Sequence, residues 1–311
     1  MSSPKSLLDK LKSKTKNSQS IKFQVFRGIK NDDGISIDHH YCYAISFLQL
    51  FFHCPNVINY FKTIKTKNPS ERLLLSIFKS LYRKNNYSSI NIFNFIINWR
   101  GWEGRCLPNE NRDVAEFIVY LLDSVTTKLS DLFLIQGEYY DNSIAPLERN
   151  YFLTLEINGN SLNDALNIGL TKCKNFTHLP EYLMLYLIRN VDMELNDKYL
   201  PINTFLKIDN IVYRHLATIV FGGDVSSGHY TSYIKIDDEY FLFNDENVSP
   251  LFYYERCPRD LRSFITECNN QINRKGTIFL YCKSNDKYMK NIYECISFLS
   301  PFLSLPGSSP I

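Results

Sequence analysis

Residues 228–245 read GHYTSYIKIDDEYFLFND, a pattern of two strand-like segments on either side of an Asp-Asp turn. Both segments are rich in Tyr, Phe and Ile, which are favoured in strands. If the two segments pair as a hairpin, the end of the second returns to the start of the first. We therefore expect Asn244 and Asp245 to lie beside His229.

A histidine next to an Asn or Asp side chain can act as a general base, and in thiol peptidases it activates a cysteine. Cys42 is the candidate nucleophile, because it lies where a loop leads into the apolar, helix-like segment 42–53. A helix N-terminus and a nearby histidine both stabilise a thiolate, which is the reactive form. The alternatives at these positions are a buried structural cysteine, a hydrogen-bonded core histidine and an ordinary Asn-Asp turn.

The first 130 residues are dominated by helical periodicity and the remainder by strand-like segments. The clearest helix is 111–130, because Val114, Phe117 and Leu121 share one apolar face. The other predicted helices span 42–53, 70–82 and 91–99, with Pro55 limiting the first. The predicted strands span 151–157, 183–188, 213–221, 230–236, 240–243 and 277–282. Helices followed by antiparallel strands indicate an α+β fold.

The composition argues against several classes of protein. The eight cysteines are scattered without a Cys-x-x-Cys pair, so we expect no zinc ribbon, no other metal site and no cofactor. Scattered cysteines favour a reduced, intracellular protein, cytoplasmic or nuclear. The net charge of +3 is too small to indicate nucleic acid, and no apolar run is long enough to span a membrane.

The two ends of the chain differ from its middle. Residues 1–22 carry six lysines against one acid, which predicts a flexible basic arm rather than a signal peptide. Residues 283–311 are predicted to form a C-terminal tail. Its apolar stretch 292–305 is short and is interrupted by Pro301. We therefore expect this stretch to pack in the core or to form an apolar tail rather than a membrane anchor.

Several segments, taken in order, resemble the ubiquitin-specific proteases. CYAISFLQ at 42–49 looks like the cysteine box of that family, and 228–245 looks like its histidine box. NRDVAEFI at 111–118 and LPEYLMLYLIR at 179–189 are similar to a helix and a strand that lie between the boxes. The resemblance covers about 34–282, and its strongest support is the order of the pieces. Further similar strands lie at 213–220 and 276–281.

The resemblance implies a papain-like cysteine peptidase fold. A helical thumb would span 30–135, and an antiparallel β palm with shortened, zinc-free fingers would span 136–282. By position, Cys42 resembles the nucleophile, His229 the base and Asn244 the group that orients the imidazole. Asp245 would assist Asn244 or substitute for it.

The resemblance also implies a substrate. The protein would be a deubiquitinating thiol isopeptidase that cleaves ubiquitin or a ubiquitin-like modifier after its C-terminal glycine. Asp113 and Glu116 match acidic positions that resemble the family's grip on the basic ubiquitin tail, and Gly228 and Tyr230 are further candidate substrate contacts. The alternative for Asp113 and Glu116 is a helix N-cap followed by a solvated helix face.

The sequence departs from the family pattern at three places. The amide expected five residues before the cysteine to stabilise the oxyanion falls on Ile37, although backbone N–H groups, His39 or His40 could compensate. The finger region between Leu166 and Leu179 is very short. His39, His40 and Tyr41 also replace the small residues usually found before the cysteine. These departures keep two alternatives open: an inactive binding or scaffold module, and a general endopeptidase acting on unfolded chains.

Overall fold

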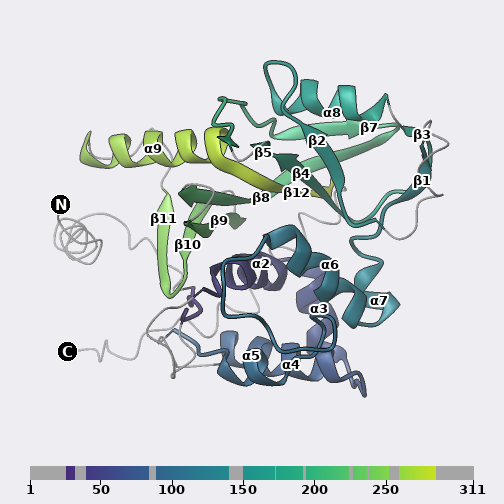
Figure 1. Ribbon diagram of the computed structural model, residues 1–311, viewed down its shortest axis with the longest axis vertical. Helices are drawn as coiled ribbons and strands as arrows, with labels where there is room; N and C mark the ends of the chain where they lie inside the picture. The colour runs from purple at the N-terminus through teal and green to yellow at the C-terminus, as the bar shows by residue number, and fades with distance from the viewer. Residues whose placement is uncertain are drawn as a thin grey trace, which may run out of the picture.

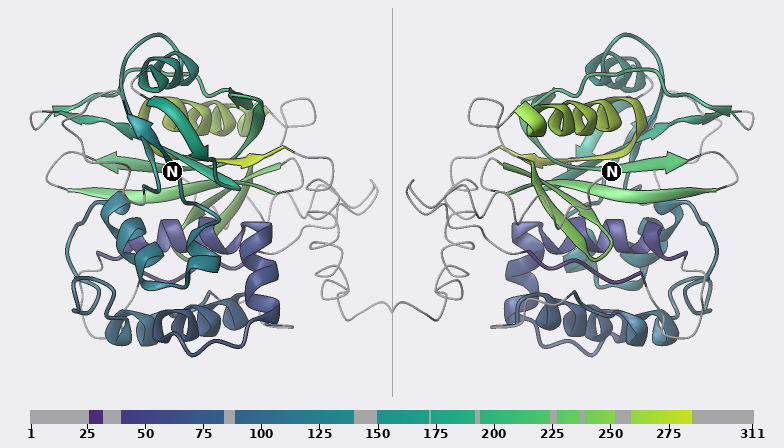
Figure 2. Two further views of the ribbon diagram at one scale, coloured as in Figure 1. Left: turned by 90° about the vertical axis from the view of Figure 1, so that its right-hand side faces the viewer. Right: turned by 90° about the vertical axis from the view of Figure 1, so that its left-hand side faces the viewer.

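The computed structural model describes residues 26–31, 40–83, 89–139, 150–171, 173–191, 194–223, 227–236, 239–251 and 259–284. The predicted basic arm 1–22 and nearly all of the tail 283–311 lie outside these residues. Within them, a helical half packs against a large sheet, and two further helices lie beyond the sheet (Figure 1, Figure 2).

The helical half follows the predicted order. Its helices are α2 (Cys42–Phe52), α3 (Pro55–Thr63), α4 (Pro69–Leu81), α5 (Phe93–Asn98), α6 (Val114–Ser124) and α7 (Thr127–Ser130). Pro55 ends the first predicted helix and starts α3, where its fixed φ suits the first helical turn. The helices α8 (Leu162–Leu170) and α9 (Arg259–Lys275) belong to the second half, and neither they nor α3 were expected from the sequence.

The second half is built on a sheet of eight strands. Seven run in the order β11-β10-β9-β8-β12-β4-β2, and β7 pairs with β8 outside this path. The strands are β2 (Leu153–Glu156), β4 (Tyr182–Ile188), β7 (Phe205–Ile208), β8 (Ile211–Gly223), β9 (Gly228–Ile236), β10 (Glu239–Asn244), β11 (Asn247–Leu251) and β12 (Gly276–Lys283).

Two pairs of short strands stand outside the large sheet. One pair is β1 (Gln136–Tyr139) with β3 (Cys173–His178), which lies at the edge of the molecule in Figure 1. The other is β5 (Asn190–Val191) with β6 (Glu194–Leu195). The β1–β3 ladder lies where the shortened fingers were predicted.

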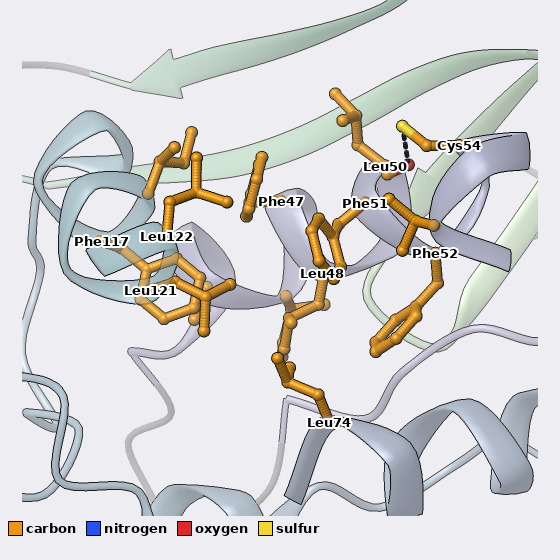
Figure 3. Packing of buried hydrophobic residues seen from close by; sticks show 14 of the residues in the cluster. Phe47, Leu48, Leu50, Phe51, Phe52, Cys54, Leu74, Phe117, Leu121 and Leu122 are labelled. Atoms are coloured by element: carbon orange, nitrogen blue, oxygen red, sulfur yellow. Dashed lines mark hydrogen bonds between the residues drawn. The ribbon is translucent and has the colours of Figure 1, made fainter. Parts of the chain in front are cut away.

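Helix α2 lies between the sheet and the other helices. All of its residues are buried, so it is a core helix rather than an amphipathic surface helix. Figure 3 shows Phe47, Leu48 and Phe51 packed among apolar residues of α4 and α6. This packing fixes the axis of α2, and with it the place where the helix begins.

The opposite face of the sheet is covered by the two helices of the second half. Apolar residues of α8 pack on β2 and β4, and Cys268 and Ile272 of α9 pack near Val220 and Tyr233. The central strands β4 and β12 are therefore covered on both faces, whereas the outer strands β7, β10 and β11 are partly exposed.

Two sequence predictions need correction at the level of single elements. Helix 111–130 is interrupted after Ser124, because the N–H and the hydroxyl of Thr126 both donate to the buried Glu71 carboxylate, at 3.0 and 2.6 Å. Strand β2 pairs parallel to β4, although the palm was expected to be antiparallel. The connection through α8 makes this possible, since parallel neighbours need a crossover.

The mixed helix and sheet architecture agrees with the predicted α+β fold. No helix in the described part of the chain is long and apolar enough to cross a membrane.

Candidate active site

The candidate nucleophile, Cys42, is the first residue of α2. The first N–H groups of a helix have no partner inside the helix, so they favour negative charge nearby. Tyr41 is the N-cap residue, and its side chain accepts no capping hydrogen bond from this turn. The sulfur of Cys42 therefore lies at the positive end of a rigid, buried helix.

His229 faces Cys42 from the sheet. It is the second residue of β9, and its imidazole forms side-chain hydrogen bonds with Cys42 and with Asn244. The bond between His229 Nε2 and Asn244 Oδ1 is 2.7 Å long. An amide oxygen only accepts, so Nε2 carries a proton and Nδ1 is left to face the sulfur. This is the tautomer that a general base for the thiol needs.

Asn244 and Asp245 reach His229 through the predicted hairpin. Strands β9 and β10 pair antiparallel, and Asn244 is the last residue of β10. Asp245 begins the turn to β11 with a φ of 50°, and its Oδ2 lies 3.7 Å from His229 Nε2. The amide is thus the closer partner of the imidazole, and the carboxylate adds negative charge behind it.

The surroundings of His229 favour its protonated form. The hydrogen bond to Cys42 is the largest contribution, followed among the favourable ones by Asn244 and the charge of Asp245, and together they raise the pKa of His229 to about 9 against the opposing effect of burial. The side chain remains 41% exposed, so a substrate could reach it. A positively charged imidazole next to a sulfur is one way to stabilise a thiolate.

The start of α6 lies beside this group. Asp113 caps the helix, since its Oδ1 accepts from Ala115 N–H at 2.6 Å, and its Oδ2 accepts from the Tyr186 hydroxyl at 3.1 Å. The Tyr230 side chain bonds to the backbone of Val114 and interacts electrostatically with Cys42 and Asp113. The N-cap alternative therefore describes Asp113 correctly, and its predicted contact with substrate stays a prediction.

Glu116 and Gly228 flank the same region. Glu116 is exposed in the first turn of α6, and partial burial raises its pKa. A Cβ at position 228 would collide with the ring of Phe221, so the packing of β8 against β9 is itself a reason for glycine there. Both residues keep their predicted substrate roles as predictions.

Of the residues before Cys42, His40 and Tyr41 are described, whereas Ile37 and His39 lie outside the described residues. The backbone N–H of His40 donates to Asn109 Oδ1 at 3.3 Å, and Tyr41 is buried. The loop that contains Asn109 is also tied to α2, because the Tyr43 hydroxyl donates to Pro108 O at 2.8 Å. These two hydrogen bonds hold the loop that contains Pro108 and Asn109 against the start of α2.

The sequence analysis missed Asn31. Its side chain contacts both Asp245 and the backbone N–H of Tyr41, so it joins the two sides of the site. A count of five residues back from Cys42 cannot find it, because Asn31 lies 11 positions before Cys42 in the sequence. Among the described residues, no group of three or more His, Cys, Asp or Glu side chains could hold a metal ion.

Comparison with known families agrees with this geometry. The profile of the family described as ubiquitin carboxyl-terminal hydrolase matches residues 34–281, which include Cys42, His229 and Asn244. The chain belongs to the ubiquitin carboxyl-terminal hydrolase family. No curated protein sequence matches it.

Solved structures resemble this chain in fold. A chain of the SAGA Ubp8/Sgf11/Sus1/Sgf73 DUB module is 18% identical with a TM-score of 0.59, and covers 90% of this chain and 73% of its own. A chain of that module bound to monoubiquitin is 16% identical, with a TM-score of 0.58 and the corresponding coverages 90% and 74%. An essential yeast splicing factor is 19% identical, with a TM-score of 0.58 and coverages of 84% and 70%.

The chain therefore has the papain-like arrangement of its family. The helical half around α2 corresponds to the predicted thumb and the sheet to the predicted palm, and the candidate residues lie where the two meet. The low identities show that the fold is retained in a divergent sequence.

Proposed function

We propose that this protein is an active thiol isopeptidase that removes ubiquitin or a ubiquitin-like modifier from its conjugates. The observation that carries the proposal is the imidazole of His229, which hydrogen-bonds Cys42 on one side and Asn244 on the other. A buried structural cysteine has no need of such an arrangement. Nucleophile, base and orienting amide come from three different elements and meet at one point.

The reaction begins at the sulfur of Cys42. The thiolate attacks the carbonyl carbon of the modifier's C-terminal glycine, and the carbonyl electrons move to the oxygen. His229, which took the thiol proton, then gives that proton to the leaving lysine amine as the C–N bond breaks. Water attacks the resulting thioester with His229 as base, and the modifier leaves with a free carboxylate.

The transition state carries negative charge on the carbonyl oxygen. Backbone N–H groups in the first turn of α2 are suitable donors, because they point out of the helix N-terminus beside the sulfur. Asn244 keeps the imidazole oriented through the 2.7 Å bond to Nε2. Asp245 stabilises the imidazolium that forms during attack.

The modifier's tail is the expected occupant of the region next to α6. Asp113 and Glu116 present carboxylates there. Tyr230 interacts electrostatically with both Asp113 and Cys42. A basic tail ending in small residues fits acidic side chains at the approach to a buried nucleophile. The need for a free thiol at Cys42 also supports the predicted intracellular location.

An electrophilic probe tests this proposal. Ubiquitin carrying a C-terminal electrophile should label the wild-type protein at Cys42, and Cys42→Ala should abolish the labelling. Cys106→Ala is the matched control, since Cys106 is an exposed free thiol on another loop. Probes built on ubiquitin-like proteins, used in parallel, identify the modifier.

The competing function is a binding module that retains the fold without catalysis. Ile37 at the position expected for an amide donor and the short β1–β3 ladder favour it. If no ubiquitin or ubiquitin-like probe labels Cys42 while the folded protein still binds the unmodified modifier, the binding module is correct.

A further inference from the structure

The face of the β7–β8 ladder that points away from α8 carries exposed apolar side chains. Leu206 and Ile208 of β7 are buried with Tyr213 of β8 in the core beneath α8. Because side chains alternate along a strand, Phe205 of β7 and Val212 of β8 point to the other face. They are 54% and 40% exposed, and Phe205 is the most exposed large apolar residue in the described part of the chain.

These two side chains are neighbours on a face that the helical half leaves open. Phe205 pairs with Arg214, two residues beyond Val212, so Phe205 and Val212 are diagonal neighbours. Diagonal neighbours lie about 7–8 Å apart, a distance that an aromatic side chain can bridge. Cys282 of β12 pairs with Arg214 from the other side and is buried in the core of the helical half. The helices therefore cover this face over β12 and stop short of the β7–β8 ladder.

Strand β7 is also an edge of the large sheet. Among the described strands, only β8 pairs with it. An edge strand presents unpaired backbone groups that invite association, and proteins usually cover or charge such an edge. An exposed aromatic side chain beside it adds to the tendency to associate. A cover from another part of the chain or from a second molecule would remove this liability.

The chain leaves the sheet right beside this face. Strand β12 ends at Lys283, whose backbone N–H donates to Glu181 O at 3.0 Å. The next residue, Ser284, donates its backbone N–H to Val212 O at 2.8 Å. The last described residue is therefore fixed against Val212. Phe205 lies on the strand beyond, about 10 Å across the sheet from β12.

The sequence after Ser284 supplies a suitable cover. Residues 292–305 read IYECISFLSPFLSL, with Glu294 as their one charged residue. From Ser284 to Ile292 the chain can span up to about 28 Å, which is more than the distance to β7. A tether this short gives an effective concentration of about 1 mM, which favours the chain's own segment over a second molecule.

We propose that the apolar stretch 292–305 packs on Phe205 and Val212 and covers the edge of the β7–β8 ladder. This docking surface is separate from the active site, because Val212 begins β8 whereas Gly222, near its end, pairs with His229. About 33 Å of extended strand separates the two. The docking therefore stabilises the sheet without touching the reacting groups, and it does not depend on the proposed isopeptidase activity.

Photocrosslinking in the full-length chain tests this docking directly. A p-benzoylphenylalanine in place of Phe205 should crosslink to the tail, and the same group in place of Ile168, exposed on α8 at the opposite face, is the matched control. Trypsin releases 291–311 as one peptide, because no Lys or Arg follows Lys290, so mass spectrometry identifies the crosslinked partner. We expect at least about fivefold more crosslinked 291–311 from position 205 than from position 168.

A mixture of unlabelled and isotopically labelled chains shows whose tail is captured. Crosslinks confined to single chains support the proposal. Crosslinks that join a labelled to an unlabelled chain would assign this face to a second copy of the protein. A yield at position 205 no higher than at position 168 would mean that the tail does not lie on this face. Either of the last two results overturns the proposal.

Hydrogen exchange gives a second readout that needs no crosslinker. In Phe298→Ser/Phe302→Ser the tail loses apolar surface, so the amides of β7 and of the start of β8 should exchange about 10-fold faster. The control Ser297→Ala/Ser300→Ala changes the same stretch but keeps its apolar side chains, and should exchange as the wild type does. Amides of β9 and β10 should be unaffected in both variants. Exchange in β7 that is unchanged by the loss of both Phe side chains contradicts the docking.

Discussion

Two histidines on neighbouring strands of one sheet differ in what surrounds them. His229 on β9 lies at the junction with α2, where hydrogen bonds raise its pKa to about 9. His215 on β8 is buried inside the sheet, where loss of hydration lowers its pKa to about 3. Its ring nitrogens bond the hydroxyls of Tyr240 and Thr218, at 2.9 and 2.8 Å.

The difference lies in which form of the imidazole the partners favour. Thr218 and Tyr240 can accept or donate, so they satisfy a neutral ring and close a network within the sheet. At His229 the partners are a thiol, an amide oxygen and a carboxylate, which favour the cation. A histidine at the boundary between the two halves is thus prepared for proton transfer, and one in the interior serves packing.

The largest effect is expected at His229. His229→Ala should lower the rate of modifier cleavage by about 10⁴-fold, because the thiol loses its base and the leaving amine loses its acid. The free energy of unfolding should fall by only about 1 to 2 kcal/mol, because the half-buried imidazole loses its hydrogen bonds to Cys42 and Asn244. Turnover and urea unfolding measure the two quantities. If His229→Ala lost stability but kept its activity, His229 would serve packing rather than proton transfer, contrary to the comparison with His215.

Acid should destabilise the fold through two histidines whose pKa is lowered by loss of hydration. His215 and His53, whose pKa burial lowers to about 4, both stay neutral in the folded protein and become protonated on unfolding. Their contribution is complete above an unfolded pKa of about 6.5 and is lost as the pH falls toward 4. Between pH 8 and pH 5 these two histidines together should lower the free energy of unfolding by roughly 4 kcal/mol, and the opposing contribution of His229 offsets part of this fall.

Urea titrations across this pH range measure the effect. His53→Gln should flatten the slope by about half, and a midpoint that is constant from pH 8 to pH 5 would contradict the assignment of both rings as neutral. His229 acts in the opposite sense: its contribution to stability is present below pH 6.5 and is lost as the pH rises through about 9.

His215→Ala should separate structure from chemistry. We expect about 3 kcal/mol of destabilisation, because the substitution leaves a cavity, and the buried Thr218 hydroxyl and the half-buried Tyr240 hydroxyl each lose a partner. The kcat of the folded protein should stay within about twofold of wild type. Chemical unfolding measures the stability, and turnover is measured at a temperature well below thermal unfolding. A loss of kcat in the folded variant would show that His215 also serves the reaction.

Asn244 and Asp245 should contribute unequally. The amide lies 2.7 Å from His229 Nε2 and the carboxylate 3.7 Å from it. Asn244→Ala should therefore lower kcat about 50-fold, and Asp245→Asn only about fivefold. The two kcat values at saturating substrate decide the order. A larger loss in Asp245→Asn would make the carboxylate the principal partner of the imidazole.

The smallest effect is expected at Tyr240. Tyr240→Phe removes one hydroxyl from His215 and should cost about 1 kcal/mol of stability with no change in kcat. Thermal unfolding with turnover as the control checks this, and a kcat that falls with the hydroxyl would link the interior network to the site.

Much of the fold was predictable because its signals are local. The apolar periodicity around Phe117 and the alternating strands on either side of Asp237-Asp238 each depend on neighbours in the sequence. The break at Thr126 was not predictable, because it depends on Glu71, a carboxylate 55 residues away. The parallel pairing of β2 with β4 likewise depends on the path of α8.

The same distinction holds in the site. Cys42, His229 and Asn244 could be singled out from the sequence because each lies at or next to the start or end of an element whose pattern is local. Asn31 lies on a segment without periodicity, and its partners Asp245 and Tyr41 are brought to it only by folding. Spacing from Cys42 directed attention to Ile37, which lies outside the described residues, whereas the contacts of Asn31 become visible only in three dimensions.

The central claim is that Cys42 and His229 act as one nucleophile–base pair, and alkylation tests it without any assumption about the modifier. Iodoacetamide reacts with thiolates, and the exposed thiol of Cys106 serves as the reference within the same protein at pH 6. We expect Cys42 to react at least about 10-fold faster than Cys106 despite its burial, and His229→Ala to remove this advantage. If Cys42 reacts no faster than Cys106, or keeps its rate without the imidazole, the pair does not exist.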